Sequence, residues 1–287
     1  MFHAQPIESL DLPELQPYRT MRRSQEQRDQ GIFVAEGEKV VRRLLESPFP
    51  VVSVLLPDKW LAIFEPLLTA RPEMAIPVFV VSEKRVLEEL VGFSMFQGVL
   101  AVGRIPAPPS LDNLLKRSSK PRLFTAVDAL TNAENLGALV RNCVAFNVQG
   151  LIVGETSSSP FLRRAVRNSM GTIFQLPVFE LAQANAAILP GRPRPATLSQ
   201  VLLDLRKRGV RCLAAHPRAN AKTLCQTDFS GDCCLVFGSE GYGLSAETLA
   251  ACDEAVSIPM PPAVDSLNVG SAAAVFLYEV NRQRGRA

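Results

Sequence analysis

The chain has 287 residues, of which 47% are hydrophobic and 21% charged, and its net charge is +3. This composition is that of a globular protein and excludes a wholly disordered or fibrous chain. The length favours one large domain or two of medium size. No apolar run approaches the roughly 18 residues of a membrane helix, and the N-terminus lacks the basic and apolar regions of a signal peptide. We therefore expect a soluble, cytoplasmic protein that has no membrane partner.

Side chains that could bind a metal are few. The six cysteines show no C-x-x-C spacing, and His3 and His216 are the two histidines. We interpret the cysteines as reduced and buried, with Cys233 and Cys234 pointing to opposite faces of an apolar strand. A zinc hydrolase or a histidine-centred catalytic triad has almost nothing to be built from, so we expect no metal.

The first part of the chain alternates apolar runs with amphipathic segments. The pattern predicts strands at 33–37, 51–57, 76–82 and 97–105, and helices at 38–47, 59–70 and 83–91. An alternation of this size indicates a small α/β domain over residues 1–104.

Residues 105–121 differ from both flanks. The stretch from Arg104 to Arg122 contains four prolines, a Ser-Ser pair and five basic residues, which predicts a linker. Residues 1–104 carry 12 Lys and Arg against 14 Asp and Glu, whereas residues 105–287 carry 19 against 14. This excess of positive charge is compatible with a polyanionic partner and equally with an ordinary solvated surface.

After the linker the alternation restarts. We expect strands at 122–128, 149–154, 174–179, 210–216, 233–238 and 255–259, and helices near 136–146, 159–170, 197–208, 245–252 and 267–283. This pattern predicts a second domain at 122–287, with a mostly parallel sheet covered by helices on both faces. Such sheets bind ligands at the carboxyl ends of their strands. The long loop 181–196 is interpreted as an insertion or a substrate contact.

Three loops at strand ends carry candidate chemistry. In the first, Asn135 is expected to cap a helix, with Arg141 on the helical face of Gly137 and Asn147 at a left-handed C-cap. In the third, residues 258–284, a proline-stiffened turn leads to Ser266, the expected N-cap, and Asn268 falls in the first helical turn. Taken alone, the first loop is a weak signal that many capped helices share, and for the third loop helix capping is the favoured interpretation.

The second loop, residues 237–249, places three glycines and Glu240 after a buried strand, and Ser245 is the expected cap of the next helix. Gly241, Gly243 and Ala246 also fit the G-x-G-x-x-A fingerprint of dinucleotide-binding folds. Such folds need several βα units after the fingerprint, whereas fewer than 50 residues follow Gly241. We therefore disfavour an NAD site.

In this order, and at the ends of these strands, the three loops resemble the three motifs of the SpoU (TrmH-like) RNA ribose methyltransferases of the SPOUT superfamily. The resemblance covers residues 122–284. FVAEGEK at 33–39 and QGVLAV at 97–102 resemble the L30e-like RNA-binding domain that many of these enzymes carry. The resemblance implies a C-terminal sheet with a trefoil knot, S-adenosylmethionine as cofactor, methylation of a ribose 2′-hydroxyl in RNA, and a homodimer with the active site at its interface.

The resemblance also implies site residues. It places cofactor contacts at Gly238, Ile258 and Leu267, with Ser239 and Met260 beside them, and polar catalytic positions at Asn135, Arg141, Glu240, Ser266 and Asn268. Ser239 stands where the family usually has Asn, Ala133-Glu134 where it commonly has Asp-Pro, and Asn147 where it commonly has Gly. All the polar catalytic positions are retained, so these departures bear on the substrate more than on the activity.

Because a guanidinium stays protonated in proteins, we interpret Arg141 as a phosphate anchor and a stabiliser of the developing alkoxide, with base action left open. Glu240 orients Arg141 or accepts the proton. A separate N-terminal domain suits a large structured RNA, which favours ribosomal RNA over transfer RNA. The alternative from another class is a non-catalytic RNA-binding protein.

Overall fold

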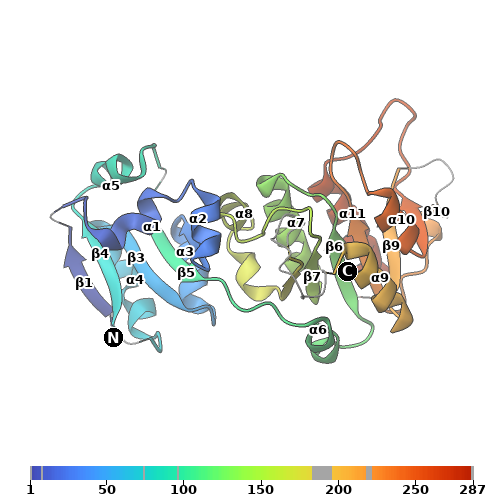
Figure 1. Cartoon of the computed structure of the whole chain (residues 1–287), viewed down its shortest axis with the longest axis horizontal. Helices are drawn as coiled ribbons and strands as arrows, with labels where there is room; N and C mark the ends of the chain where they lie inside the picture. The colour runs from blue at the N-terminus through green and yellow to red at the C-terminus, as the bar shows by residue number, and fades with distance from the viewer. Residues whose placement is uncertain are drawn as a thin grey trace, which may run out of the picture. The chain divides into compact units, whose positions relative to one another are not determined.

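The computed structural model (Figure 1) describes residues 2–7, 9–73, 75–95, 97–182, 196–217 and 222–285. The chain divides into two compact units. The first comprises Met1–Ala107 and Pro160–Gln175, and the second comprises Pro108–Ser159 and Leu176–Ala287. A short segment from the middle of the chain therefore packs within the N-terminal unit. The domain bounds 1–104, 105–121 and 122–287 stay a prediction.

The first unit is built on a mixed sheet in the order β1-β4-β3-β5-β2. Its strands are β1 (Phe2–Pro6), β2 (Ile32–Glu36), β3 (Val51–Pro57), β4 (Ile76–Val81) and β5 (Leu100–Arg104). The pairs β1–β4 and β3–β4 are parallel, whereas β5 runs antiparallel to both β3 and β2. Three of these strands lie within predicted runs, β2 overlaps the run predicted at 33–37, and β1 was not predicted.

The helices of this unit are α1 (Gln16–Arg19), α2 (Ser24–Asp29), α3 (Glu38–Glu46), α4 (Leu61–Thr69), α5 (Lys84–Val91) and α8 (Arg163–Asn168), with short 3-10 turns at Pro13–Leu15, Asp58–Trp60 and Thr172–Gln175. The apolar spacing of 38–47 correctly predicted α3, which buries its four aliphatic residues. The 3-10 turn at Thr172–Gln175 replaces the first two residues of the strand expected at 174–179, because Gly171 with φ +78° opens a turn that buries Ile173 and Phe174.

An aromatic cluster explains why Pro160–Gln175 belongs to the first unit. Phe161 and Phe174 from this segment pack on Phe33 and Phe49, with ring centroids 5.3–6.1 Å apart. The buried carboxylate of Glu36 accepts hydrogen bonds from Arg163 and, at 2.8 Å, from Arg167 on α8. Apolar packing and a partly buried ion-pair network therefore fix α8 on β2.

The second unit is built on a parallel sheet in the order β10-β12-β9-β11-β6-β7-β8. Its strands are β6 (Leu123–Val127), β7 (Gly150–Val153), β8 (Val178–Glu180), β9 (Arg211–Ala215), β10 (Lys222–Thr223), β11 (Cys233–Phe237) and β12 (Glu254–Ser257). The pairings between these strands are parallel. The prediction of a mostly parallel sheet is confirmed.

Helices cover this sheet, as Figure 1 shows. They are α6 (Leu111–Arg117), α7 (Ala133–Ala145), α9 (Leu198–Lys207), α10 (Ala246–Ala251) and α11 (Val269–Gln283), with a 3-10 turn at Leu224–Gln226. Leucines and valines of α6 and α9 share one apolar cluster with β6, β9 and β11. On α11, Phe276 meets Phe237 of β11 edge-on at 5.7 Å. Residues 105–121, the expected linker, contain α6 with its buried Leu114 and Leu115.

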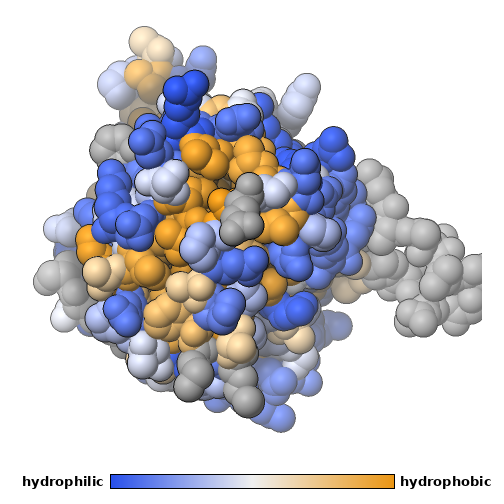
Figure 2. All heavy atoms as spheres, turned by 90° about the vertical axis from the view of Figure 1, so that its left-hand side faces the viewer, coloured by the Kyte–Doolittle hydropathy of each residue, from blue (hydrophilic) through white to orange (hydrophobic). Residues whose placement is uncertain are grey.

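Exposed apolar side chains are unevenly distributed. Figure 2 shows one face of the first unit, where apolar side chains gather in the middle and hydrophilic ones surround them. Among the described residues, Ile63 is the large apolar residue of this unit that is clearly exposed. The others lie in the second unit: Leu203, Tyr242, Val264, Leu267, Val275 and Tyr278. Three of these, Tyr242, Val264 and Leu267, belong to the loops after β11 and β12.

Candidate functional site

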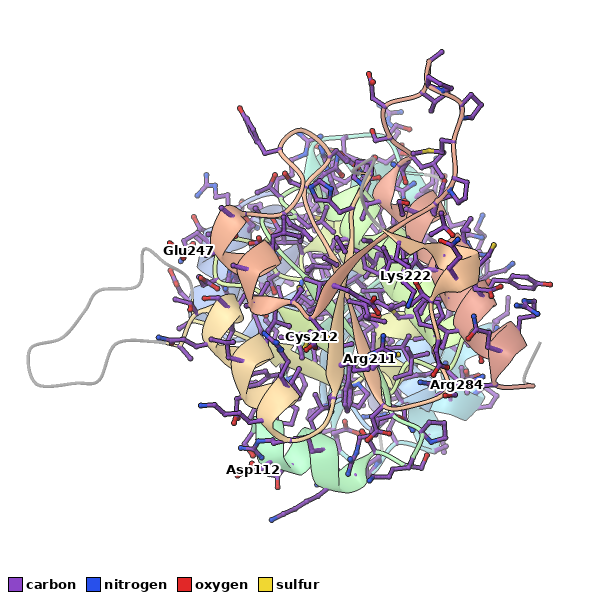
Figure 3. The ribbon with its side chains drawn as sticks, turned by 90° about the vertical axis from the view of Figure 1, so that its right-hand side faces the viewer. Asp112, Arg211, Cys212, Lys222, Glu247 and Arg284 are labelled. Atoms are coloured by element: carbon purple, nitrogen blue, oxygen red, sulfur yellow. The ribbon has the colours of Figure 1, made fainter. Side chains whose placement is uncertain are left out.

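The candidate site lies at the carboxyl ends of β6, β11 and β12. β11 pairs with β6 and with β9, and β9 pairs with β12, so these parallel strands end along one edge of the sheet. In Figure 3, loops of the C-terminal part project at the top of the view, whereas Asp112 of α6 lies at the bottom. The three loops that the sequence singled out follow these strands and meet at that end.

The first loop leads from β6 into α7. Asn132 caps this helix, since its side-chain oxygen accepts the backbone N–H groups of Glu134 at 2.9 Å and of Asn135 at 3.1 Å. Our expectation that Asn135 is the cap is wrong, because the extended backbone of Asn132 ends the loop three residues earlier. Asn135 therefore stands in the first helical turn. Asn147, with φ +57°, confirms the expected left-handed C-cap.

Arg141 lies further along α7 and is exposed. Its guanidinium makes no hydrogen bond or ion pair with the described residues. The neighbouring Asn142 donates a 2.6 Å hydrogen bond to the carbonyl of Gly270 on α11. A Cβ at Gly270 would lie 3.2 Å from that of Ala138, so α7 and α11 are in close contact here. Arg141 thus stands beside a tight helix pair with its donors available to a ligand.

The second loop, which follows β11, is a tight turn fixed by short contacts. Ser239 and Gly243 exchange two backbone hydrogen bonds of 2.9 Å, and the hydroxyl of Ser239 accepts the N–H of Tyr242 at 3.2 Å. A Cβ at Gly238 would lie 2.2 Å from the carbonyl carbon of Gly243, so the turn closes only over glycine. Ser239 therefore closes the turn.

Asp128, at the end of β6, anchors the far end of this loop. Its carboxylate is buried and accepts the backbone N–H of Ser245 at 2.9 Å. Ser245 in turn accepts the N–H of Thr248 at 3.2 Å, which confirms it as the cap of α10. The loop is held at both ends, so its residues are preorganised rather than free to rearrange.

The third loop follows β12 and enters α11. Asn268, rather than Ser266, caps this helix, because its Oδ1 accepts the N–H of Gly270 at 2.9 Å. Our expectation for Ser266 is therefore wrong. The chain from Pro261 through Asn268 remains exposed and non-helical, so the first N–H groups become available two residues later than expected. The exposed Ser266 is left in the loop.

Three of the five predicted polar residues come together. Nδ2 of Asn135 donates to Oε1 of Glu240, and Nδ2 of Asn268 donates to Oδ1 of Asn135 at 3.0 Å. Asn268 also reaches the carboxylate of Glu240 at 3.5 Å. Glu240 is thus bound to two amides and not to Arg141, which remains apart from this cluster. One loop residue, one residue of the first turn of α7 and the N-cap of α11 make up the group.

A cavity of about 420 Å³ opens beside this group. All five predicted cofactor residues line it, together with two of the predicted polar residues: Gly238, Ser239, Ile258, Met260, Leu267, Glu240 and Ser266. Apolar walls come from Phe237, Val256 and Phe276. The cavity therefore offers apolar surface, backbone groups of two loops, and a carboxylate at one side.

The sequence did not single out part of the lining. Ala215, at the end of β9, and His216 and Pro217 after it line the cavity, as does Tyr242. β9 lies between β11 and β12, so the rule that ligands bind at carboxyl ends of strands would have included it once the strand order was known. The sequence alone does not give that order.

The cysteines lie away from this chemistry. Five of the six thiols are buried, and Cys225 is exposed, which corrects our expectation that all are buried. Burial raises the pKa of Cys143 and of Cys252 to about 12. Within the described ranges no three His, Cys, Asp or Glu side chains are grouped as metal ligands, and no described helix is both long and apolar enough to span a bilayer.

Comparisons with known proteins agree with this geometry. The profile of the SpoU rRNA Methylase family matches residues 122–278. An uncharacterised tRNA/rRNA methyltransferase of Mycobacterium tuberculosis is 32% identical over 280 residues, covering 95% of this chain and 90% of that protein. The 23S rRNA (guanosine-2′-O-)-methyltransferase RlmB of Shewanella oneidensis is 31% identical over 71% of this chain and 78% of its own length. The crystal structure of an AdoMet-bound rRNA methyltransferase from Sinorhizobium meliloti has the same fold, with a TM-score of 0.78 and 21% identity over 97% of this chain and 98% of that one.

Proposed function

The chain belongs to the SpoU rRNA Methylase family, and we propose that it transfers a methyl group from S-adenosylmethionine to a ribose 2′-hydroxyl of ribosomal RNA. The observation that carries this proposal is the meeting of Asn135, Glu240 and Asn268 beside the cavity at the strand ends. Asn135 lies in the first turn of α7, Glu240 on the second loop and Asn268 at the N-cap of α11, so the group joins three segments that are far apart in the sequence. A purely structural domain has no need of such a group.

The chemistry of the cavity fits S-adenosylmethionine. Its apolar walls suit an adenine ring, and the backbone groups of 238–243 and 258–260 offer hydrogen bonds to ribose and adenine edges. We assign Gly238, Ser239, Ile258, Met260 and Leu267 as the residues that would hold it. After Gly241 the described chain contains α10, β12 and α11, which is too little for the repeated βα units of a dinucleotide fold. This supports S-adenosylmethionine over NAD.

When bound, the cofactor supplies an electrophilic methyl group on a sulfonium, and the chain must position and deprotonate the ribose hydroxyl. Glu240 accepts hydrogen bonds from two amides, which hold one carboxylate oxygen in place. We propose that this carboxylate orients the hydroxyl or accepts its proton, and that Ser266 and Asn268 bind the ribose. Arg141, with its donors available, binds a neighbouring phosphate and stabilises the developing alkoxide.

Ribosomal RNA is the substrate we favour over transfer RNA. The relative from Shewanella oneidensis that carries the name 23S rRNA methyltransferase matches beyond the methyltransferase domain, over 71% of this chain. An L30e-like N-terminal unit gives a second surface for a large folded RNA. Methyl transfer to transfer RNA, and RNA binding without catalysis, are the competing functions.

We further propose a homodimer and a knotted C-terminal chain path, as the resemblance implies. Val275 and Tyr278 on α11 are exposed although they are large and apolar, which suits a helix that packs against a second copy. A dimer would bring a second set of loops to each cavity rim.

The test combines binding with chemistry. Calorimetry should detect binding of S-adenosylmethionine and of its demethylated product, and no binding of NAD. Radiolabelled methyl transfer to total RNA from a strain lacking the gene should label one ribosomal RNA, and mapping should find a ribose-methylated nucleotide that the strain lacks. If only transfer RNA were labelled, the substrate would be transfer RNA rather than ribosomal RNA. Binding of NAD without binding of S-adenosylmethionine would overturn the proposed function.

A further inference from the structure

Tyr242 is the most exposed large apolar residue of the described chain, at 98%. It stands on the second loop, between two glycines, and lines the cavity mouth. A ring that is almost fully in water contributes nothing to the core and leaves apolar surface unburied. Single exposed apolar residues are common on protein surfaces, so it is the position of Tyr242 at the cavity, together with its exposure, that points to a role in binding.

The backbone that carries this ring is held firmly. Ser239 and Gly243 close the turn with two hydrogen bonds of 2.9 Å, and the N–H of Tyr242 itself donates to the Ser239 hydroxyl at 3.2 Å. Asp128 fixes the end of the same loop through Ser245. The ring is thus presented on a preorganised support, so a ligand that stacks on it does not have to order a flexible loop.

Tyr242 also follows the polar group closely. Glu240, two residues earlier in the same turn, is bound to Asn135 and Asn268. A nucleotide whose 2′-hydroxyl reaches Glu240 has its base attached to the same ribose, within reach of the loop tip. Phe237, Val256 and Phe276 already provide apolar walls for the cavity, so a cofactor bound there does not need the ring of Tyr242. The exposed ring is therefore available to a second ligand.

We propose that Tyr242 is a substrate-recognition residue that stacks on an unpaired base of the RNA, at or next to the methylated nucleotide. This inference rests on the proposed function. It adds the contact by which the protein selects a nucleotide whose base is unpaired over one whose base is paired. A flat ring binds any base face, so it contributes affinity for a splayed nucleotide with little preference for its identity. Hydrogen bonds from the hydroxyl of Tyr242 are not required.

The experiment compares Tyr242→Phe, Tyr242→Ala and Tyr242→Leu in methyl transfer to total RNA from a strain lacking the gene. Loss of one base stack should raise the KM for RNA about five- to hundredfold in the Ala and Leu variants, while Phe stays within about twofold of the wild type. The dissociation constant for S-adenosylmethionine and the thermal unfolding temperature should not change. Leu203→Ala, an exposed apolar residue of α9 outside the cavity, is the matched control and should behave as wild type.

A direct readout comes from Tyr242→Trp. Stacking of a base on the indole should quench the fluorescence that this variant adds to the wild-type signal when RNA is titrated in. A rise in the dissociation constant of S-adenosylmethionine that matches the rise in KM would assign the ring to the cofactor and overturn the proposal. A change in oligomeric state of the Ala variant would assign it to a subunit interface. Wild-type kinetics in Tyr242→Ala would also overturn it, whereas an inactive wild-type protein would instead refute the proposed function.

Discussion

Asn268 and Asn135, 133 residues apart in the chain, are joined by a hydrogen bond of 3.0 Å from Nδ2 to Oδ1. Oδ1 of the same Asn268 side chain accepts the N–H of Gly270 and caps α11. The oxygen of this one amide therefore caps the helix, and its nitrogen donates a hydrogen bond within the polar group of Asn135, Glu240 and Asn268. Only a side chain with both an acceptor and a donor can do this, and the two tasks can be separated by mutation.

Asn268→Asp keeps the capping oxygen, loses the donor, and adds a carboxylate next to Glu240. We expect the unfolding temperature to stay within about 2 °C of the wild type, because Asp and Asn cap equally well, and methyl transfer to fall about ten- to hundredfold. Asn268→Ala should lose similar activity and in addition about 1 kcal/mol of stability. Thermal unfolding and methyl-transfer assays measure both effects. Full activity in the Asp variant would reduce Asn268 to a helix cap.

Arg141→Ala should lower kcat for methyl transfer by about a hundred- to thousandfold, as expected when a donor to a developing oxyanion is removed. Because Arg141 does not line the cavity, the affinity for S-adenosylmethionine should stay within a few fold. Arg141→Lys should recover little, since an ammonium lacks the planar fork that grips a phosphate. Arg164→Ala, an exposed arginine of α8 in the first unit, serves as the control. Near-normal turnover of Arg141→Ala would show that the residue is only a surface charge on α7.

Local signals predicted most of the sheet elements. The runs 51–57 and 233–238 are buried strands, and the helical spacing at 197–208 is α9, with a capping box at Thr197 and Gln200. The caps of α7 and α11 were placed wrongly, because each loop offers two residues that cap well and only the loop path decides between them. The loop 181–196 lies almost entirely outside the described residues.

Contacts between segments that are far apart in the chain could not be predicted from the sequence pattern. Nothing in the pattern of 160–175 says that Phe161 and Phe174 pack on Phe33, or that Arg163 pairs with Glu36. A chain that started near Pro109 would leave those two aromatic rings without partners. Arg23 and Arg42 likewise form helical ion pairs with Glu26 and Glu38.

Gly238→Ala should weaken cofactor binding while the protein stays folded. The added Cβ would lie 2.2 Å from the carbonyl carbon of Gly243, so the turn that lines the cavity must open. We expect the dissociation constant for S-adenosylmethionine to rise at least about tenfold, equivalent to about 1.4 kcal/mol. Gly231→Ala is the matched control, since no atom lies within 4 Å of its Cβ. Calorimetry distinguishes the two, and equal affinities would show that the turn does not hold the cofactor.

The thiols should differ sharply in reactivity. Cys225 is exposed, whereas burial raises the pKa of Cys233 to about 11 and that of Cys143 to about 12. Because the thiolate is the reactive form, iodoacetamide near pH 8 should modify the native protein once, at Cys225, and all six cysteines after denaturation. Intact-mass spectrometry counts the adducts. Cys225→Ser should leave the native protein unlabelled, and rapid labelling of Cys143 would show that the core opens readily.

Acid should weaken the first unit through Glu73. Arg71, itself buried, donates to Glu73 and to the carbonyls of Leu45 and Phe49. These bonds tie the chain just after α4 to the last turn of α3 and to the segment that follows it. The hydrogen bonds from Arg71 lower the pKa of Glu73 to about 2. A lowered pKa in the folded state means that the carboxylate stabilises the protein above the unfolded-state pKa of about 4.5, and that this contribution is lost as the pH falls toward 2.

Urea unfolding at neutral pH and near pH 3 measures this contribution. We expect Glu73→Gln to lower the free energy of unfolding by about 1–2 kcal/mol at neutral pH, since the carboxylate is partly in contact with water, and by much less near pH 3. The difference between wild type and variant should therefore shrink on acidification. Glu65→Gln, a carboxylate of α4 that forms no ion pair within the described part of the chain, should show no such change. A difference between wild type and Glu73→Gln that stays constant from neutral pH to pH 3 would show that the effect is packing rather than charge.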